Sequence, residues 1–191
     1  MDNSASISAD DVAAALIQLH PGLDQMQLHK LLYLVQAGSL AWFEKPAFTE
    51  RIEAWQHGPV VRGIAGRYKS FGRNPIDKPV MGNAERLSDR TRWIVDRVLD
   101  EFGGMSGPQL ARLVKEPGMP WKEARGPIPD SAHSDAEITP KIMLEWHRRY
   151  GVVRVVPTTA ENELANRFLD GDNDALADLF EAATGVRPAL S

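Results

Sequence analysis

The chain of 191 residues contains no cysteine. This absence excludes a disulfide framework, thiolate catalysis and a zinc site with cysteine ligands, and it fits a reducing compartment. Long hydrophobic runs are also missing, because the densest early one, residues 31–35, is far too short to span a bilayer. The first residues lack the basic and apolar parts of a signal peptide, so we expect a cytoplasmic protein.

The motifs of the common enzyme classes are absent from the sequence as well. There is no glycine-rich phosphate loop and no G-x-S-x-G nucleophile elbow, and the five histidines do not show H-E-x-x-H spacing. The stretch 170–174 is rich in aspartate like a calcium loop, but we interpret it as a joint between two helices in which Asp172 caps the second. We therefore expect no enzyme, with no catalytic residue, no cofactor and no metal ion.

Charge is segregated along the chain, whose net charge is -4. Residues 51–97 carry ten Lys or Arg against five Asp or Glu, whereas residues 159–191 carry seven Asp or Glu against two Arg. An acidic chain is a poor default for a nucleic-acid binder, because affinity for nucleic acid depends on neutralising phosphates. The pattern suits a protein partner or a second copy of the chain, and two solvated faces are the alternative.

Helix starts repeat the same chemistry, in which a Ser or Asp cap is followed three residues later by an Asp or Gln. The clearest cases are Ser8 with Asp11, Asp24 with Gln27, and Ser106 with Gln109. Together with hydrophobic periodicity, these caps predict helices over residues 9–19, 24–44, 59–71, 88–102, 107–115, 140–149, 159–169 and 173–184. The second of these helices is apolar nearly all round, which indicates the buried centre of the domain.

Extended structure is predicted only in short pieces. Residues 51–55 alternate, a sharp turn follows at Gly58, and residues 152–156 form a second strand candidate. Residues 73–87 and 116–134 are rich in Pro and Gly and are predicted to be loops. We expect a mainly α fold: a compact helical domain over residues 1–150 with a small hairpin element, and an extension over residues 151–191 that contains an acidic helical pair.

Three pieces of sequence, in order, carry a family resemblance. The first is Lys30-Leu31-Leu32-Tyr33-Leu34-Val35-Gln36-Ala37 followed by Lys45-Pro46-Ala47-Phe48, the second is Ile52-Glu53-Ala54-Trp55-Gln56-His57-Gly58-Pro59-Val60-Val61 followed by Tyr68, and the third is Ser106-x-x-Gln109-Leu110 with Pro120-Trp121 and Ala124. Together they resemble the Panacea domain of SocA-like antitoxins and GepA-type phage-associated proteins. The resemblance covers roughly residues 8–148.

The resemblance implies both a fold and a function. It implies a helical domain with a small extended element, and a prophage-associated antitoxin that neutralises a cognate protein toxin by direct binding. Some members of the family act as adaptors that deliver the toxin to an ATP-dependent protease, and a homo-oligomer is a further expectation. The alternative is a prophage-associated DNA-binding transcriptional regulator that uses the basic stretch over residues 62–97. We disfavour it because no helix-turn-helix reader is recognisable.

We interpret the signature residues as structural rather than catalytic. They are Lys30, Leu31, Leu32, Tyr33, Glu53, Trp55, His57, Gly58, Pro59, Tyr68 and Trp121. Within this set we expect an ion pair between Lys30 and Glu53, a buried Trp55, a positive φ angle at Gly58 and Pro59 in the first turn of a helix. A pH-sensitive or catalytic His57 is the alternative to its structural role.

The residues that contact the partner are harder to choose, because exposure is not visible in a sequence. The candidates are large side chains that could anchor an interface: Arg112, Trp121, Trp146, Phe168 and Phe180.

Overall fold

We describe the fold from a computed structural model that defines residues 6–150 together with residues 167, 175 and 178. The fold is mainly α, as the sequence predicts. The elements in chain order are α1 (Ala9–Leu19), α2 (Gln25–Phe43), β1 (Ile52–Trp55), β2 (Gly58–Val61), α3 (Arg62–Tyr68), the 3-10 helices η1 (Lys69–Phe71) and η2 (Ala84–Arg86), α4 (Asp89–Phe102), α5 (Gly107–Leu113), α6 (Pro120–Arg125) and α7 (Pro140–Tyr150).

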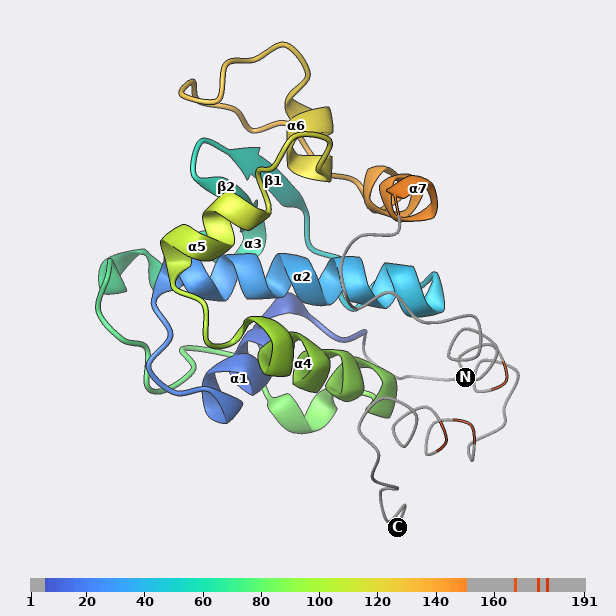
Figure 1. The fold of residues 1–191 in the computed structure, drawn as a ribbon. Coiled ribbons are helices and arrows are strands. Elements are labelled where there is room, and N and C mark those ends of the chain that lie inside the picture. Colours follow the sequence, from blue (N-terminus) through green and yellow to red (C-terminus); the bar gives the residue numbers. More distant parts are fainter. Residues whose placement is uncertain (1–5, 151–166, 168–174, 176–177, 179–191) are drawn as a thin grey trace.

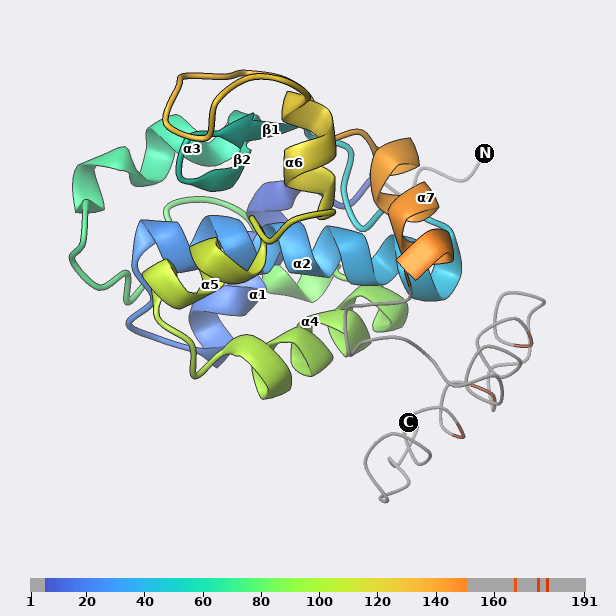
Figure 2. The ribbon, with the colours of Figure 1, turned by 45° about the horizontal axis from the view of Figure 1, so that its top comes forward.

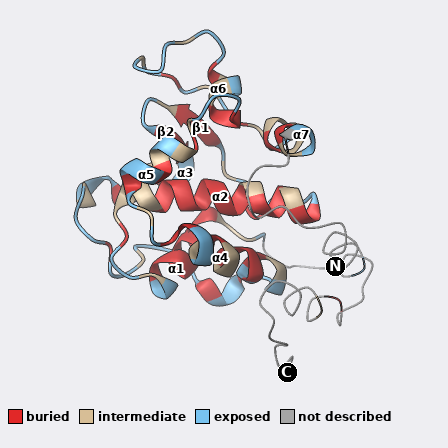
Figure 3. Cartoon of the chain, viewed as in Figure 1, coloured by how far each residue is buried: buried red, intermediate tan, exposed pale blue. Residues whose placement is uncertain are grey.

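Helix α2 runs through the middle of the domain, as its all-round apolar pattern predicts. Helices α1 and α4 lie on one side of it, and the β-hairpin, α5 and α7 lie on the other (Figures 1 and 2). Most residues of α2 and of α1 are buried, whereas α4 is buried on one face only (Figure 3). This arrangement makes α2 the element against which the hairpin and α5 are positioned.

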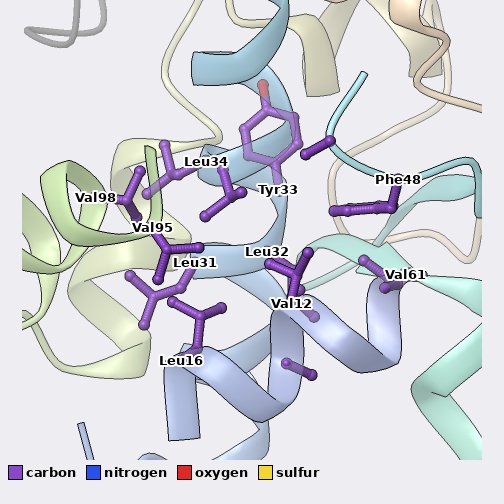
Figure 4. Close-up of a cluster of buried hydrophobic side chains, with 14 of the residues drawn as sticks. Val12, Leu16, Leu31, Leu32, Tyr33, Leu34, Phe48, Val61, Val95 and Val98 are labelled. Atoms are coloured by element: carbon purple, nitrogen blue, oxygen red, sulfur yellow. The ribbon is translucent and has the colours of Figure 1, made fainter. Parts of the chain in front are cut away.

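The core consists mainly of leucine, valine and aromatic side chains. Leu31, Leu32 and Leu34 of α2 pack with Val12 of α1 and Val98 of α4 in one buried cluster (Figure 4). Each fully buried side chain of this size stabilises the fold by about 1.5–3 kcal/mol relative to an exposed one. The leucines of the signature thus hold the two sides of the domain onto α2.

The predicted caps form as expected at three helix starts. Ser8 and Asp11 make a reciprocal capping box at α1, and the Asp24 carboxylate accepts a hydrogen bond from the Gln27 backbone N–H at 2.8 Å while Gln27 Oε1 accepts from the Asp24 N–H. At α5 the Ser106 N–H donates to Gln109 Oε1 at 2.8 Å. These bonds satisfy backbone donors that a helix start otherwise leaves unpaired.

The two strands form an antiparallel hairpin in which Ile52 lies opposite Val61 and Trp55 lies opposite Gly58. Gly58 has a φ angle of 103°, which confirms the predicted left-handed position. The prediction that Pro59 begins a helix is wrong, because Pro59 lies in β2 and α3 begins only at Arg62. The helix predicted over residues 59–71 is therefore a strand, a short helix and a 3-10 turn.

A second correction concerns the segment 116–134, which the sequence predicts to be a loop. It contains α6, in which Pro120 stands at the start and Trp121 is fully buried. After the loop that follows α6, the chain returns alongside β1, where the Ala54 N–H donates to Ala136 O and the Ile138 N–H donates to Ile52 O, both at 2.8 Å.

The predictions for the extension concern residues outside the described part. The strand over 152–156, the joint over 170–174 and the helices over 159–169 and 173–184 fall there, apart from single described positions. Within the described part of the chain, no helix combines the length and apolar character that a membrane crossing requires.

Candidate functional site

Two neighbouring residues of α2 hold the hairpin. His29 Nδ1 accepts a hydrogen bond from the Val61 N–H at 3.2 Å, and Lys30 Nζ donates to the Pro59 carbonyl oxygen at 3.2 Å. Both side chains are buried, so both bonds lie away from water. Burial lowers the pKa of His29 to about 3, with a smaller contribution from the charge of Lys30. A neutral imidazole is the form that can accept the Val61 hydrogen bond.

Lys30 is the one lysine of the described chain whose side chain is buried, with 2% of the residue exposed. Burial lowers its pKa to about 7; Asp24 opposes this shift and the charge of Lys115 adds to it. A Cβ added at Gly58 would lie 2.9 Å from Lys30 Cε, so only glycine lets the turn close over this side chain. The turn and the lysine are therefore packed as one unit.

The expected Lys30–Glu53 ion pair is wrong, because the structure gives each residue other partners. Glu53 is 6% exposed, and its carboxylate accepts from Trp55 Nε1 at 2.7 Å. Its charge is met by Arg51 at 3.4 Å and by Arg62 at 4.0 Å. Two arginines therefore compensate the charge of the buried Glu53 carboxylate, and Lys30 donates to the Pro59 carbonyl instead.

Trp121 attaches α6 to the hairpin. Its Nε1 donates to the Trp55 carbonyl oxygen at 2.8 Å, and its ring is fully buried. Lys115 Nζ lies 4.6 Å and the Arg125 guanidinium 4.8 Å from the ring centroid, which are attractive cation–π distances. Trp121 therefore has a structural position and is not free to anchor a partner.

A groove opens beside the hairpin turn, where α2, α3 and α5 converge. It consists of two adjoining pockets, of about 730 Å³ and about 530 Å³, that share Met26, His57 and Pro108 in their walls. The larger pocket runs from the start of α2 to α3 and the turn after it, and the smaller one runs along α5 to Pro117. We call the two together the basic groove.

The charges of the basic groove are mostly of one sign. Six cationic side chains line it: Lys30, Arg62, Lys69, Arg73, Arg112 and Lys115. Asp24 and Glu116 are its acidic residues, and apolar side chains such as Met26 and Val60 lie between the charges. Such a surface attracts anionic groups and also offers apolar contact area.

The basic groove offers charged and apolar groups. Among the described residues that line it there is no serine, threonine or tyrosine. No group of three His, Asp or Glu that could hold a metal ion occurs among the described residues. Lys30 Nζ is engaged with a backbone carbonyl, which suits a positioned charge.

The comparison with family models decides the relationship. The model of the Antitoxin SocA-like, Panacea domain matches residues 28–122. These residues belong to the SocA-like Panacea family. The matched range runs from α2 into α6 and includes every cationic residue of the basic groove. Searches of the curated proteins and of the solved structures found no match.

The signature residues of the Panacea domain lie around α2 and the hairpin. Leu31, Leu32 and Tyr33 are buried in the core, and the buried Tyr68 hydroxyl accepts a hydrogen bond from the Val80 N–H at 3.3 Å. Two further members lie in the wall of the groove: His57 is exposed, and Trp55 is half-buried rather than buried as predicted.

The candidate contact residues differ in their exposure to solvent. Arg112 is exposed and lines the basic groove of the Panacea domain. Trp146 is 6% exposed and belongs to the core, so its selection as a surface anchor is wrong. Phe168 and Phe180 lie outside the described residues.

Sequence reasoning missed two residues that organise the domain. His29 is treated above, and Gln36 is the second: its Oε1 accepts from the Ala47 and Phe48 N–H groups and its Nε2 donates to the Phe48 carbonyl. Gln36 stands inside the first signature piece and His29 directly precedes it, and a polar residue on a helix that is apolar all round is the signal that points to them. The groove itself has no such local signal.

Proposed function

We propose that this protein is an antitoxin that neutralises a cognate protein toxin by direct binding, without catalysis. The observation that carries the proposal is the SocA-like Panacea match, because the matched residues supply all six cations of the basic groove. The groove offers a rigid surface, since its walls are fixed by buried hydrogen bonds from α2. Rigid walls lose little conformational entropy when a partner binds.

Stoichiometric occlusion is the mechanism that this surface supports best. A groove of about 730 Å³ with an adjoining pocket of about 530 Å³ accommodates a protruding segment of a partner rather than a flat surface. A toxin that inserts its active or membrane-inserting segment there is blocked for as long as the complex lasts. Delivery of the bound toxin to an ATP-dependent protease is a further step that the same complex would allow.

The experiment is co-expression of this chain with the product of the reading frame next to its gene. Growth should be restored when both are expressed, and the two proteins should co-purify. Occlusion predicts that neutralisation persists in a host without the ATP-dependent protease, whereas delivery to that protease predicts that it is lost. Failure of the wild-type chain to restore growth or to bind the product would contradict the antitoxin role, and a salt-sensitive complex with its own promoter DNA would favour the regulator instead.

A further inference from the structure

Lys30 has hydrogen-bonding capacity that the described part of the chain does not use. An ammonium group has three donors, and the Pro59 carbonyl is the partner that the described residues give it. The side chain lies in the wall of the larger pocket although the residue is 2% exposed. A buried cation with spare donors costs free energy unless an anion or several acceptors meet it.

The side chain cannot easily turn elsewhere for partners. The Gly58 turn packs against Lys30 Cε, and the Pro59 carbonyl holds its Nζ from the hairpin side. On its own helix, His29 is buried and neutral, and Asp24 is the carboxylate that acts on Lys30. From α5 and the residues after it, the charge of Lys115 opposes the protonated form. The spare donors therefore face the groove.

The surroundings add positive charge that the acidic residues lining the groove, Asp24 and Glu116, offset only in part. Arg62, Lys69 and Arg73 lie in the wall of the same pocket and are exposed. Arg112 and Lys115 continue the positive surface along the adjoining pocket. Among the described lining residues two acidic residues stand against these six cations, so the group that this part of the groove lacks is an anion.

The lining favours a protein as the source of this anion over a nucleic acid. Met26, Val60, Ala65 and Pro108 place apolar surface between the cations, which a phosphate backbone would leave unused. The ring of Trp55 already faces the Arg62 guanidinium at 6.0 Å, so it is a poor platform for stacking a base. Apolar surface flanked by cations instead complements an amphipathic segment with acidic side chains.

We propose that the basic groove binds an acidic amphipathic segment of the partner protein, and that one carboxylate of this segment sits over Lys30 as the anchor. The inference rests on the proposed function, because it specifies the chemistry of the toxin segment that the antitoxin occludes. The anchoring carboxylate supplies the acceptors that Lys30 lacks, and the exposed arginines hold the neighbouring acidic residues. Partner selection then depends on the placement of acidic residues in the toxin.

The test uses the full chain with lysine labelled in its side chain and three probes: an end-capped hexaglutamate peptide, inorganic phosphate and a DNA duplex. The Lys30 resonance, assigned by its loss in Lys30→Met, is followed by NMR as pH is varied. Hexaglutamate should shift this resonance and raise the pKa of Lys30. The double variant Lys69→Glu/Arg73→Glu should weaken peptide binding by about tenfold or more. Lys45→Glu, an exposed lysine just beyond the opposite end of α2, is the matched control and should bind like the wild type.

Several outcomes would overturn the inference. They are an unmoved Lys30 resonance with hexaglutamate, equal binding by the double reversal and the wild type, or a response to phosphate or DNA that exceeds the response to the peptide. The rim substitutions keep the test decisive even if Lys30→Met fails to fold, because Lys69 and Arg73 are exposed. If the double variant loses peptide binding but still rescues growth, the acidic anchor is refuted and the antitoxin role stands. If the wild-type chain binds the peptide but does not rescue growth, the antitoxin role is refuted.

Discussion

Replacement of Lys30 by methionine should change how the stability of the domain depends on pH. Methionine keeps the length and the apolar stem of the side chain and removes only the amine, so the packing beneath Gly58 is largely kept. Folding lowers the pKa of Lys30 from 10.5 to about 7. The unfolded chain therefore binds a proton that the folded chain has released, over the pH range between these two values.

The sign and magnitude follow from this difference in bound protons. A depressed pKa contributes stability that is fully present above the unfolded value and is lost as pH falls towards the folded value. Within the window from about 10 down to about 7, Lys30 makes the free energy of unfolding fall by up to about 1.4 kcal/mol for each pH unit. Lys30→Met lacks this slope, so its stability relative to the wild type should be highest near pH 7 and should decline as pH rises.

The assay is urea unfolding followed by circular dichroism at a series of pH values for the wild type, Lys30→Met and Lys45→Met. Other lysines and tyrosines that titrate in the same range affect all three proteins, so the informative quantity is the difference between the variant and wild-type curves. Lys45 is exposed, and its variant should run parallel to the wild type. Parallel curves for Lys30→Met and the wild type would refute the buried, depressed lysine on which the anionic anchor depends.

Other substitutions test the packing of the domain around its core helices. Gly82→Ala should destabilise the domain by about 2 kcal/mol or more in urea unfolding, because its φ angle is 94° and an added Cβ would lie 2.0 Å from the Asp10 carbonyl oxygen. Gly66→Ala is its control: nothing lies within 4 Å in the middle of α3, so thermal unfolding should show unchanged or slightly raised stability. Gln36→Ala should lower the free energy of unfolding by about 2–3 kcal/mol, because it leaves buried backbone groups without a hydrogen-bond partner. A variant as stable as the wild type would contradict this role. The exposed Gln18→Ala should stay within about 0.5 kcal/mol of the wild type.

The helix starts and the central helix could be predicted from the sequence because their causes are local. A capping residue and its partner lie three positions apart, as at Ser8 and Asp11, and the apolar pattern of α2 needs no knowledge of its neighbours. Strand β2 could not be predicted in this way. Its four residues include Gly58 and Pro59, and what holds them extended is pairing with β1 and hydrogen bonds from His29 and Lys30.

The candidate site depends even more on tertiary structure. The basic groove brings together residues from Asp24 to Pro117 in the sequence, and no spacing along the chain predicts that they converge. The sequence indicates Arg112 as a large side chain that could anchor a partner, and the fold places it in the groove. It indicates Trp146 for the same reason, but Trp146 is buried because exposure is decided by how α7 packs on α2.

The most direct test of the account is calorimetric titration of the purified full chain with the toxin that it is proposed to neutralise. We expect a tight complex of fixed stoichiometry with the wild type and with Lys45→Glu, and an affinity at least about tenfold lower for Lys69→Glu/Arg73→Glu. The same affinity for all three proteins, or neutralisation of the toxin without a measurable complex, would contradict it.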